Sequence, residues 1–447
     1  MAYLPHSDAD RRRMLEAIGV ASLEELLGDI PEVLRSRKPL EVPDAMDEMT
    51  LLAHLEALSR RNAVAQGHCS FLGAGVYDHF IPAVVPQLAS RGEFLTAYTP
   101  YQPELSQGTL QAIFEFQTLI CQLTGMEVAN ASMYDGASAT AEAVLMAHRL
   151  KPRGQVLASA GLHPEYRQVL ETYVTPLGLK LSSIPLTEDG RTDAEAARSL
   201  GGPDTCCIVG QSPNFYGIVE PWETFTEAAR RCDALSIAVI AEALSLGLFR
   251  PPAAADLVAG EGQSFGLAPQ YGGPHLGFFA AKERYLRQMP GRIVGRTRDR
   301  RDQPGFVLTL ATREQHIRRQ RATSNICTNH SLCALAATIY LCTVGKQGLR
   351  RLAELNARKA AYARHLLTEV PGVRRTYAAP HFNEFVITCE RSAAAICAAV
   401  EAGGVTPGLP LSRYDAGRPN DLLVCVTEKR SRAEIERCAE LLAKQCR

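Results

Sequence analysis

The sequence lacks the features that mark several large classes of protein. Its 447 residues contain 48 basic and 48 acidic side chains, so no net charge favours nucleic acid or an anionic membrane as a partner. The longest uninterrupted apolar stretch, about residues 332–344, is shorter than the roughly 18 to 20 residues that a bilayer span needs. The first residues contain no hydrophobic segment typical of a secretory signal. We therefore expect a cytoplasmic protein with neither nucleic-acid nor membrane partners.

The thirteen cysteines also follow no recognisable spacing pattern. They form no C-x-x-C pair, and several lie inside apolar runs, as Cys121 does. The sequence therefore predicts neither a disulfide framework nor a metal site. With 46% apolar and 21% charged residues, the composition is that of a globular protein of two or three domains.

Four short motifs that suggest common chemistries are incomplete. Asp78 stands where a dinucleotide-binding loop beginning at Gly73 needs its third glycine, and Tyr340 occupies the first glycine position of a phosphate loop ending at Gly345-Lys346. Residues 210–214, GQSPN, place a proline where an esterase needs a backbone N–H. The run His163-Pro-Glu has no P-C-x-x-C partner of a zinc deaminase, so a helix start is the preferred interpretation.

Hydrophobic patterns divide the chain into three regions. Residues 1–90 are predicted to form a helical arm, residues 91–325 a large α/β domain, and residues 326–447 a connecting helix followed by a small α+β domain. Helical patterns separate most of the predicted strands of the large domain, which favours parallel strands joined by crossovers. These strands are 155–159, 180–186, 205–211, 236–242 and 275–281.

Three polar segments are candidates for a functional site. Small and hydroxyl residues at 136–140 open a predicted helix, whose free N–H groups could bind an anion; tight helix packing explains them equally well. Residues 95–108, rich in tyrosine, proline and polar side chains, resemble a loop shaped for a site. Between residues 284 and 321, eleven arginines face only three acidic residues, in a stretch that we expect to be loop-like. Its composition suits binding of phosphate or carboxylate, or docking of an acidic partner, whereas the alternative is a solvated surface.

Taken together, several runs resemble the glycine decarboxylase family, the pyridoxal-phosphate-dependent P-protein of the glycine cleavage system. They are FLGAGVYDHFIPAVV, TAYTPYQPELSQG, ANASMYDGASATAEA, YGGPHLGFFAA, MPGRIVGRTRD, ATREQHIRRQRATSNICTN and VCVTEKR. A single-chain member is about twice as long as this chain, and the order of the runs resembles subunit 1, the N-terminal half of the two-subunit form. The resemblance implies the aminotransferase-like α/β fold, fold type I of pyridoxal-phosphate (PLP) enzymes.

The resemblance also implies where a cofactor would be held, and there the chain departs from the family. Glu242 lies where an acidic residue pairs with the pyridine nitrogen, but Gln263 stands where the family has its Schiff-base lysine. None of the eight lysines fits that role, so the resemblance implies no catalytic lysine in this chain and PLP on a partner subunit. Gly136, Ser138, Thr140 and Glu242 are then vestigial cofactor-binding candidates.

In this fold type the active site lies between two subunits, and the resemblance implies that this chain lends two loops to its partner. The candidates are Tyr98, Tyr101, Gln102, Glu104, Arg313, His316, Thr323, Ser324 and Asn325, with Thr323 and Ser324 directed at the partner's cofactor phosphate. The implied partners are subunit 2, with two copies of each subunit, and H-protein, which supplies the lipoyl group. Glycine is the implied substrate. A self-sufficient PLP enzyme with an unusual lysine and a silent scaffold or regulatory subunit are the alternatives.

Overall fold

The computed structural model describes residues 5–35, 38, 41–62 and 67–446, and its contacts divide the chain into two units, 1–65 and 66–447. The first unit is helical, as predicted, with α1 (Asp8–Ile18) and α2 (Glu48–Ser59) joined by two short 3-10 turns. Ser7 and Asp10 cap α1 reciprocally, and Gly19 ends it in the left-handed conformation. No residue of α1 or α2 is buried. Among its described residues this unit has no buried core.

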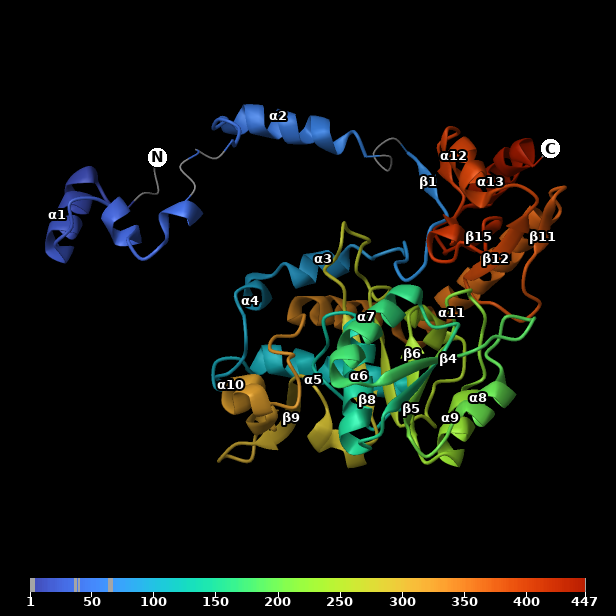
Figure 1. Cartoon of the computed structure of the whole chain (residues 1–447), viewed down its shortest axis with the longest axis horizontal. Coiled ribbons are helices and arrows are strands. Elements are labelled where there is room, and N and C mark those ends of the chain that lie inside the picture. Colours follow the sequence, from blue (N-terminus) through green and yellow to red (C-terminus); the bar gives the residue numbers. More distant parts are fainter. Residues whose placement is uncertain (1–4, 36–37, 39–40, 63–66, 447) are drawn as a thin grey trace. The chain divides into compact units, whose positions relative to one another are not determined.

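A seven-stranded, mainly parallel sheet forms the centre of the second unit (Figure 1). All five predicted strands are present, but the last of them, at 275–281, is antiparallel to its neighbours. The strand beside it, Leu257–Glu261, is parallel to its other neighbour and was not predicted. In spatial order the strands are β2 (Val128–Ala129), β8 (Gly277–Ala281), β7 (Leu257–Glu261), β6 (Leu235–Ile240), β5 (Thr205–Gln211), β3 (Gln155–Ser159) and β4 (Lys180–Ile184).

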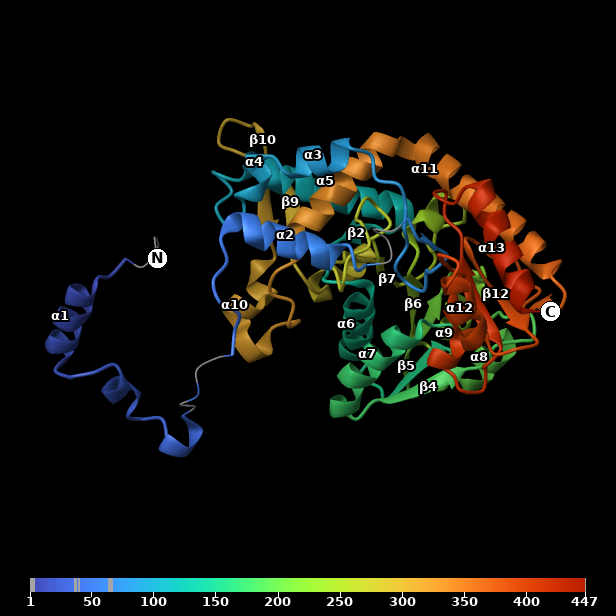
Figure 2. The same ribbon diagram turned by 90° about the horizontal axis from the view of Figure 1, so that it is seen from above.

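Helices cover both faces of this sheet because its strands are apolar on both sides. In β6, Ile237 and Val239 pack with α6 (Gly136–Leu150) and α7 (Pro164–Val174), whereas Ala238 and Ile240 face the opposite layer. That layer contains α5 (Gln107–Thr124) and the first part of α11 (Ser331–Thr368), which lie side by side in Figure 2. The helices α8 (Ala194–Leu200) and α9 (Trp222–Arg231) cover the sheet near β4 and β5. His163 caps α7 and Pro164 begins it, so the predicted helix start is confirmed.

The arginine-rich stretch is more ordered than predicted. It forms an antiparallel hairpin of β9 (Ile293–Arg298) and β10 (Pro304–Thr309), and the expectation of a loop there was wrong. Val294, Phe306 and Leu308 pack against α5, so apolar residues between the arginines anchor the hairpin. The short helix α10 (Gln315–Arg318) follows.

The C-terminal region contains the connecting helix, strands and further helices expected of a small α+β domain. Helix α11, bent at Gly345, leads to a four-stranded antiparallel sheet covered by two helices. By length and composition α11 is apolar enough to cross a membrane, but its buried side chains pack in the core of the unit. The strands are β11 (Val373–Arg375), β12 (Glu384–Cys389), β15 (Asp421–Cys425) and β14 (Leu409–Pro410), and the helices are α12 (Ala393–Glu401) and α13 (Arg432–Gln445).

The segment before α5 forms one short strand and two short helices. Strand β1 (Cys69–Ser70) pairs in parallel with β13 (Val405–Thr406), and α3 (Val84–Ala89) and α4 (Gly92–Leu95) then lead toward α5. Residues 69–70 thus belong with the C-terminal region of the same unit. The boundaries at residues 90 and 325 stay predictions.

Candidate functional site

The N-terminus of α6, the candidate anion cradle, is filled by side chains of the chain itself. An isolated bridge between Met133 and Gly277 brings this helix start beside the end of β7. There the Gly136 N–H donates to Glu261 Oε2 at 3.0 Å, and the Asp135 carboxylate caps the Ser138 N–H at 2.7 Å. A Cβ on Gly136 would lie 2.1 Å from the Tyr166 hydroxyl oxygen, so glycine is required for close packing. The Thr140 hydroxyl donates to the Gly136 carbonyl at 2.7 Å.

Glu261 is the residue that closes this cradle. Its Oε1 also accepts from the Gln263 and Leu276 N–H groups, each at 2.9 Å, and its side chain is buried. Burial raises the pKa of the Glu261 carboxyl group, while His275 and the donated N–H groups oppose that shift. A phosphate placed here would meet a carboxylate that already holds the helix N-terminus. The residues of this position therefore do not fit a cofactor phosphate, and the contacts favour the packing interpretation of the 136–140 segment.

Gln263 joins two backbone segments at the position where the family resemblance implies a lysine. Its side chain is buried; Nε2 donates to the carbonyl groups of Tyr77, at 3.0 Å, and Leu267, at 2.6 Å. Its Oε1 accepts from the Tyr77 N–H at 2.9 Å. The amide therefore uses both ends to fasten residue 77 to the loop after β7, which an imine-forming side chain could not do.

Glu242, at the end of β6, belongs to a buried ionic network. His79 bridges two carboxylates, with Nε2 3.2 Å from Glu242 and Nδ1 2.7 Å from Glu428. Burial opposes protonation of His79, but the two carboxylates outweigh it and raise its pKa to about 10. Although burial works against ionisation of Glu428, the bond from His79 lowers its pKa to about 2. Glu242 therefore faces an imidazolium of its own chain, a partner that the sequence did not reveal.

A further buried carboxyl group explains the run FLGAGVYDHF. Glu384, on β12, accepts hydrogen bonds from the Ala74 N–H at 2.6 Å and the Tyr77 hydroxyl at 2.7 Å. Burial raises the pKa of Glu384 to about 7 despite these bonds, and Glu242 adds to the shift. A Cβ on Gly73 would lie 2.4 Å from Glu384 Oε1, so this glycine permits the close approach.

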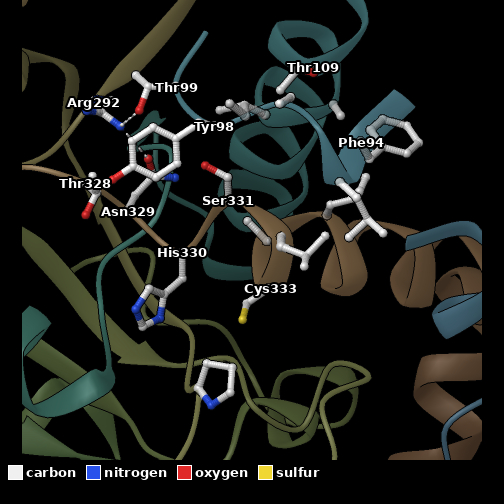
Figure 3. A pocket seen from close by; sticks show the side chains of 18 residues that line it. Phe94, Tyr98, Thr99, Thr109, Arg292, Thr328, Asn329, His330, Ser331 and Cys333 are labelled. Carbon is white, nitrogen blue, oxygen red and sulfur yellow. Dashed lines mark hydrogen bonds between the residues drawn. The ribbon is translucent and has the colours of Figure 1, made fainter. Parts of the chain in front are cut away.

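The two loops that were predicted to serve a site converge on Arg292, which Figure 3 shows bonded to Thr99 of the first loop. This guanidinium is only 4% exposed, and Nη2 donates to the Tyr101 hydroxyl at 3.0 Å. Its Nη1 lies 3.4 Å from both Thr99 Oγ1 and Asn329 Oδ1. The Tyr101 ring in turn lies 5.7 Å from the His316 ring, centroid to centroid. Residues from 98–104 and 313–325 thus meet around one buried cation.

The counter-ion of Arg292 is Glu314, but the two do not form a hydrogen bond. Their closest atoms, Nε and Oε2, are 3.8 Å apart, and the His316 Nδ1 lies 3.6 Å from the same carboxylate. Arg292 Nε and Glu314 Oε1 are both buried without a hydrogen-bond partner. The guanidinium also borders a cavity of about 360 Å³ whose polar lining includes Tyr98, Thr99, Asn329, His330 and Ser331. This arrangement can bind a small anion, such as a carboxylate.

The other candidate residues lie on the same two loops with different contacts. Tyr98 is 82% exposed, and Gln102, Glu104 and Asn325 are exposed as well. Arg313 is buried and donates to the carbonyl groups of Met289 and Gly291, so it supports the chain on either side of Pro290. The Thr323 N–H donates to the Arg313 carbonyl at 3.0 Å, and the Ser324 hydroxyl accepts from the Ile326 N–H at 3.0 Å.

Sequence reasoning missed Glu261, His79, Arg292 and Glu314 as members of these clusters. Arg292 and Glu314 lie in two of the runs that resemble the P-protein family, but only folding distinguishes them from the exposed charged residues around them. The thirteen cysteines are free thiols, and no group of three metal-ligating side chains occurs among the described residues.

Comparison with known sequences identifies a family. The sequence model of the glycine cleavage system P-protein matches residues 1–442. A relative from Moorella thermoacetica, named probable glycine dehydrogenase (decarboxylating) subunit 1, is 48% identical over 438 residues, which cover 98% of each chain. A relative of the same name from Anaeromyxobacter dehalogenans is 49% identical and covers 95% of this chain and 96% of its own.

Solved structures agree with this assignment and confirm the predicted fold. The crystal structure of glycine decarboxylase (P-protein) of the glycine cleavage system, in inhibitor-bound form, has a TM-score of 0.89 and 44% identity, and covers 99% of this chain and 100% of its own. Sphingosine-1-phosphate lyase from Burkholderia pseudomallei is 16% identical with a TM-score of 0.66, covering 92% of this chain and 93% of its own. This second likeness shows the fold alone.

Proposed function

Because this chain belongs to the glycine cleavage system P-protein family, we propose that it is subunit 1 of a two-subunit glycine dehydrogenase (decarboxylating). Its match to relatives named subunit 1 extends over nearly the whole of both chains. The complex would release carbon dioxide from glycine and transfer the remaining aminomethyl group to the lipoyl group of H-protein. We place the complex in the cytoplasm.

One structural observation supports a division of labour between the subunits. The position that would hold a cofactor in this chain is occupied by Glu261 and Gln263, whereas two polar loops converge on Arg292 beside a cavity. In the proposal, PLP is bound to a lysine of subunit 2, and this chain contributes residues to that subunit's active site. Two copies of each subunit form the assembly.

The buried guanidinium gives this chain a specific task in the proposed reaction. Arg292 is fixed by Thr99, Tyr101 and Asn329, so it can orient a carboxylate without losing much side-chain freedom on binding. Tyr101 and His316 close the same cluster, and Tyr98, Gln102 and Glu104 lie on the adjoining loop. Thr323 and Ser324 stay candidates for a contact with the partner's cofactor phosphate.

The first experiment compares the chain alone with the chain mixed with its second subunit. Visible absorbance after addition of PLP reports a Schiff base, and glycine-dependent exchange of carbon dioxide reports catalysis. We expect both only when subunit 2 is present. A stable Schiff-base band in this chain alone would instead support a self-sufficient enzyme and overturn the division of labour.

Variants of Arg292 separate an active contribution from a scaffold. In the assembled complex, Arg292→Gln should raise the KM for glycine at least tenfold because a charge-assisted hydrogen bond contributes about 1.5–3 kcal/mol. Arg292→Lys should recover part of the loss, and Arg198→Gln, at an exposed position of α8, should have no effect. Unchanged kinetics and complex stability for both Arg292 variants would favour the scaffold alternative.

The exposed arginines of the hairpin serve a second proposed role, the docking of an acidic H-protein. Arg296 and Arg298 lie on β9, and Arg300 and Arg301 lie in the turn that follows. Neutralising all four should raise the KM for H-protein and weaken its salt dependence. If neither changes, this surface does not receive the carrier.

A further inference from the structure

A second cavity, separate in its lining from the one beside Arg292, is bordered by five arginines. Its volume is about 330 Å³, and it lies where the end of α6 meets the segments 287–288 and 310–323. Its lining contains neither aspartate nor glutamate. The arginines are Arg149, Arg287, Arg313, Arg318 and Arg321, accompanied by the hydroxyl groups of Thr312 and Thr323.

These five guanidinium groups lack nearby counter-ions. Among the ion pairs of the described residues, none within 4.0 Å involves any of the five, although the chain as a whole has equal numbers of basic and acidic residues. The carboxylates of Glu142 and Glu314 influence the pKa values of Arg149 and Arg313 from a greater distance. Like charges gathered in this way repel one another unless an anion lies among them.

Arg313 makes the cavity a built site and not only a charged surface. Its side chain is 8% exposed, its Nε has no hydrogen-bond partner, and it borders the cavity. Its two Nη atoms bond to backbone carbonyls of Met289 and Gly291 and are therefore held in place. Burial lowers the pKa of Arg313, which means that its charge lacks part of the solvation that an anion could supply.

Helix stabilisation explains only one of the five charges. Arg149 lies in the last turn of α6, where a cation interacts favourably with the helix dipole. Arg287, Arg318 and Arg321 come from other segments and are exposed, and Arg313 is buried on another short turn. Their convergence on one cavity therefore needs a separate reason.

We infer that this cavity binds a phosphate group, either free or carried on a small molecule. Several guanidinium groups can each give paired hydrogen bonds to phosphate oxygens, and the two threonine hydroxyl groups can satisfy the remaining ones. A hollow of this volume suits a small anion better than the flat face of an acidic protein. Two sources share this chemistry: inorganic phosphate or a free phosphate ester, and the phosphate of a cofactor on a partner subunit.

The test begins with this chain alone and inorganic phosphate, so its outcome does not depend on the proposed function. Calorimetry in low-salt chloride buffer should show saturable binding. The double variant Arg318→Gln/Arg321→Gln should weaken that binding at least tenfold, since two charge-assisted contacts are lost. The double variant Arg198→Gln/Arg374→Gln removes the same charge at exposed positions outside the cavity and should bind phosphate normally.

The assembled complex then distinguishes the sources. A loss of PLP affinity in the first double variant, with normal affinity in the second, identifies the cofactor phosphate; normal PLP affinity in both identifies a free phosphate. Either result supports the site. The phosphate site would be overturned if the unmodified chain showed no saturable phosphate binding, or if the two double variants weakened that binding equally. An effect of the variants on H-protein binding would not rescue it.

Discussion

Glu261 provides the most direct test of the closed cradle. Substitution to alanine removes the acceptor of three buried N–H groups, those of Gly136, Gln263 and Leu276. Each buried donor left without a partner costs about 1–3 kcal/mol. Water that enters the vacated space satisfies some of them, so we expect the low end of the sum, a loss of at least about 3 kcal/mol in the free energy of unfolding.

Glu261→Gln separates the acceptor from the volume it fills. The amide keeps the size of the side chain and one accepting oxygen, but its nitrogen cannot accept from an N–H group. At least one donor therefore stays unsatisfied, and we expect a loss of about 1–3 kcal/mol. Glu440→Ala, at an exposed position of α13, serves as the control and should change stability by less than about 0.5 kcal/mol.

Urea unfolding and hydrogen exchange together measure these effects. The urea midpoint reports stability if the slope with urea is unchanged, and exchange of the Gly136 and Leu276 amides reports local opening at the end of β7. Both amides should exchange faster in the alanine variant than in the control. If Glu261→Ala and the control give the same midpoint and the same exchange rates, Glu261 does not hold the helix N-terminus as described.

Three further predictions follow from the buried groups and the backbone. Because the pKa of Glu384 is raised to about 7 in the folded chain, the protonated carboxyl group favours folding. The free energy of unfolding should therefore fall by about 1.4 kcal/mol per pH unit as the pH rises from about 4.5 to 7. Glu384→Gln should flatten this part of a plot of the urea midpoint against pH. Gln263→Lys alone should give no borohydride-trappable band with PLP, because Glu261 still fills the cradle; a stable band would contradict this explanation. Gly345→Ala should lower the free energy of unfolding by about 1–3 kcal/mol, because the backbone angles φ 62° and ψ 178° suit only glycine. A Cβ there would meet no atom within 4 Å, so the loss would come from backbone strain alone. An unchanged midpoint of thermal or urea unfolding would refute this backbone strain.

Features that depend on a few neighbouring residues were predictable. The apolar runs around Val156, Ile208 and Val239 became strands, and Pro164 began a helix, since burial of a local pattern and the fixed φ of proline need no distant partner. Strand β7 and the β9–β10 hairpin were missed because their stability comes from packing against other segments. Phe306, for example, lies between arginines and threonines in sequence but packs beside α5.

The sequence by itself determined the family, the alternation of strands and helices, and the absence of a lysine at position 263. Those properties depend on residue identity and short-range order along the chain. Only the tertiary structure decided that Glu261 accepts a hydrogen bond from Gly136, 125 residues away in the sequence. It also decided that the Arg292 guanidinium contacts Tyr101, which precedes it in the sequence, and Asn329, which follows it. The reason is physical: the cost of burying a charge depends on the donors and acceptors that surround it, and folding brings these together from distant parts of the chain.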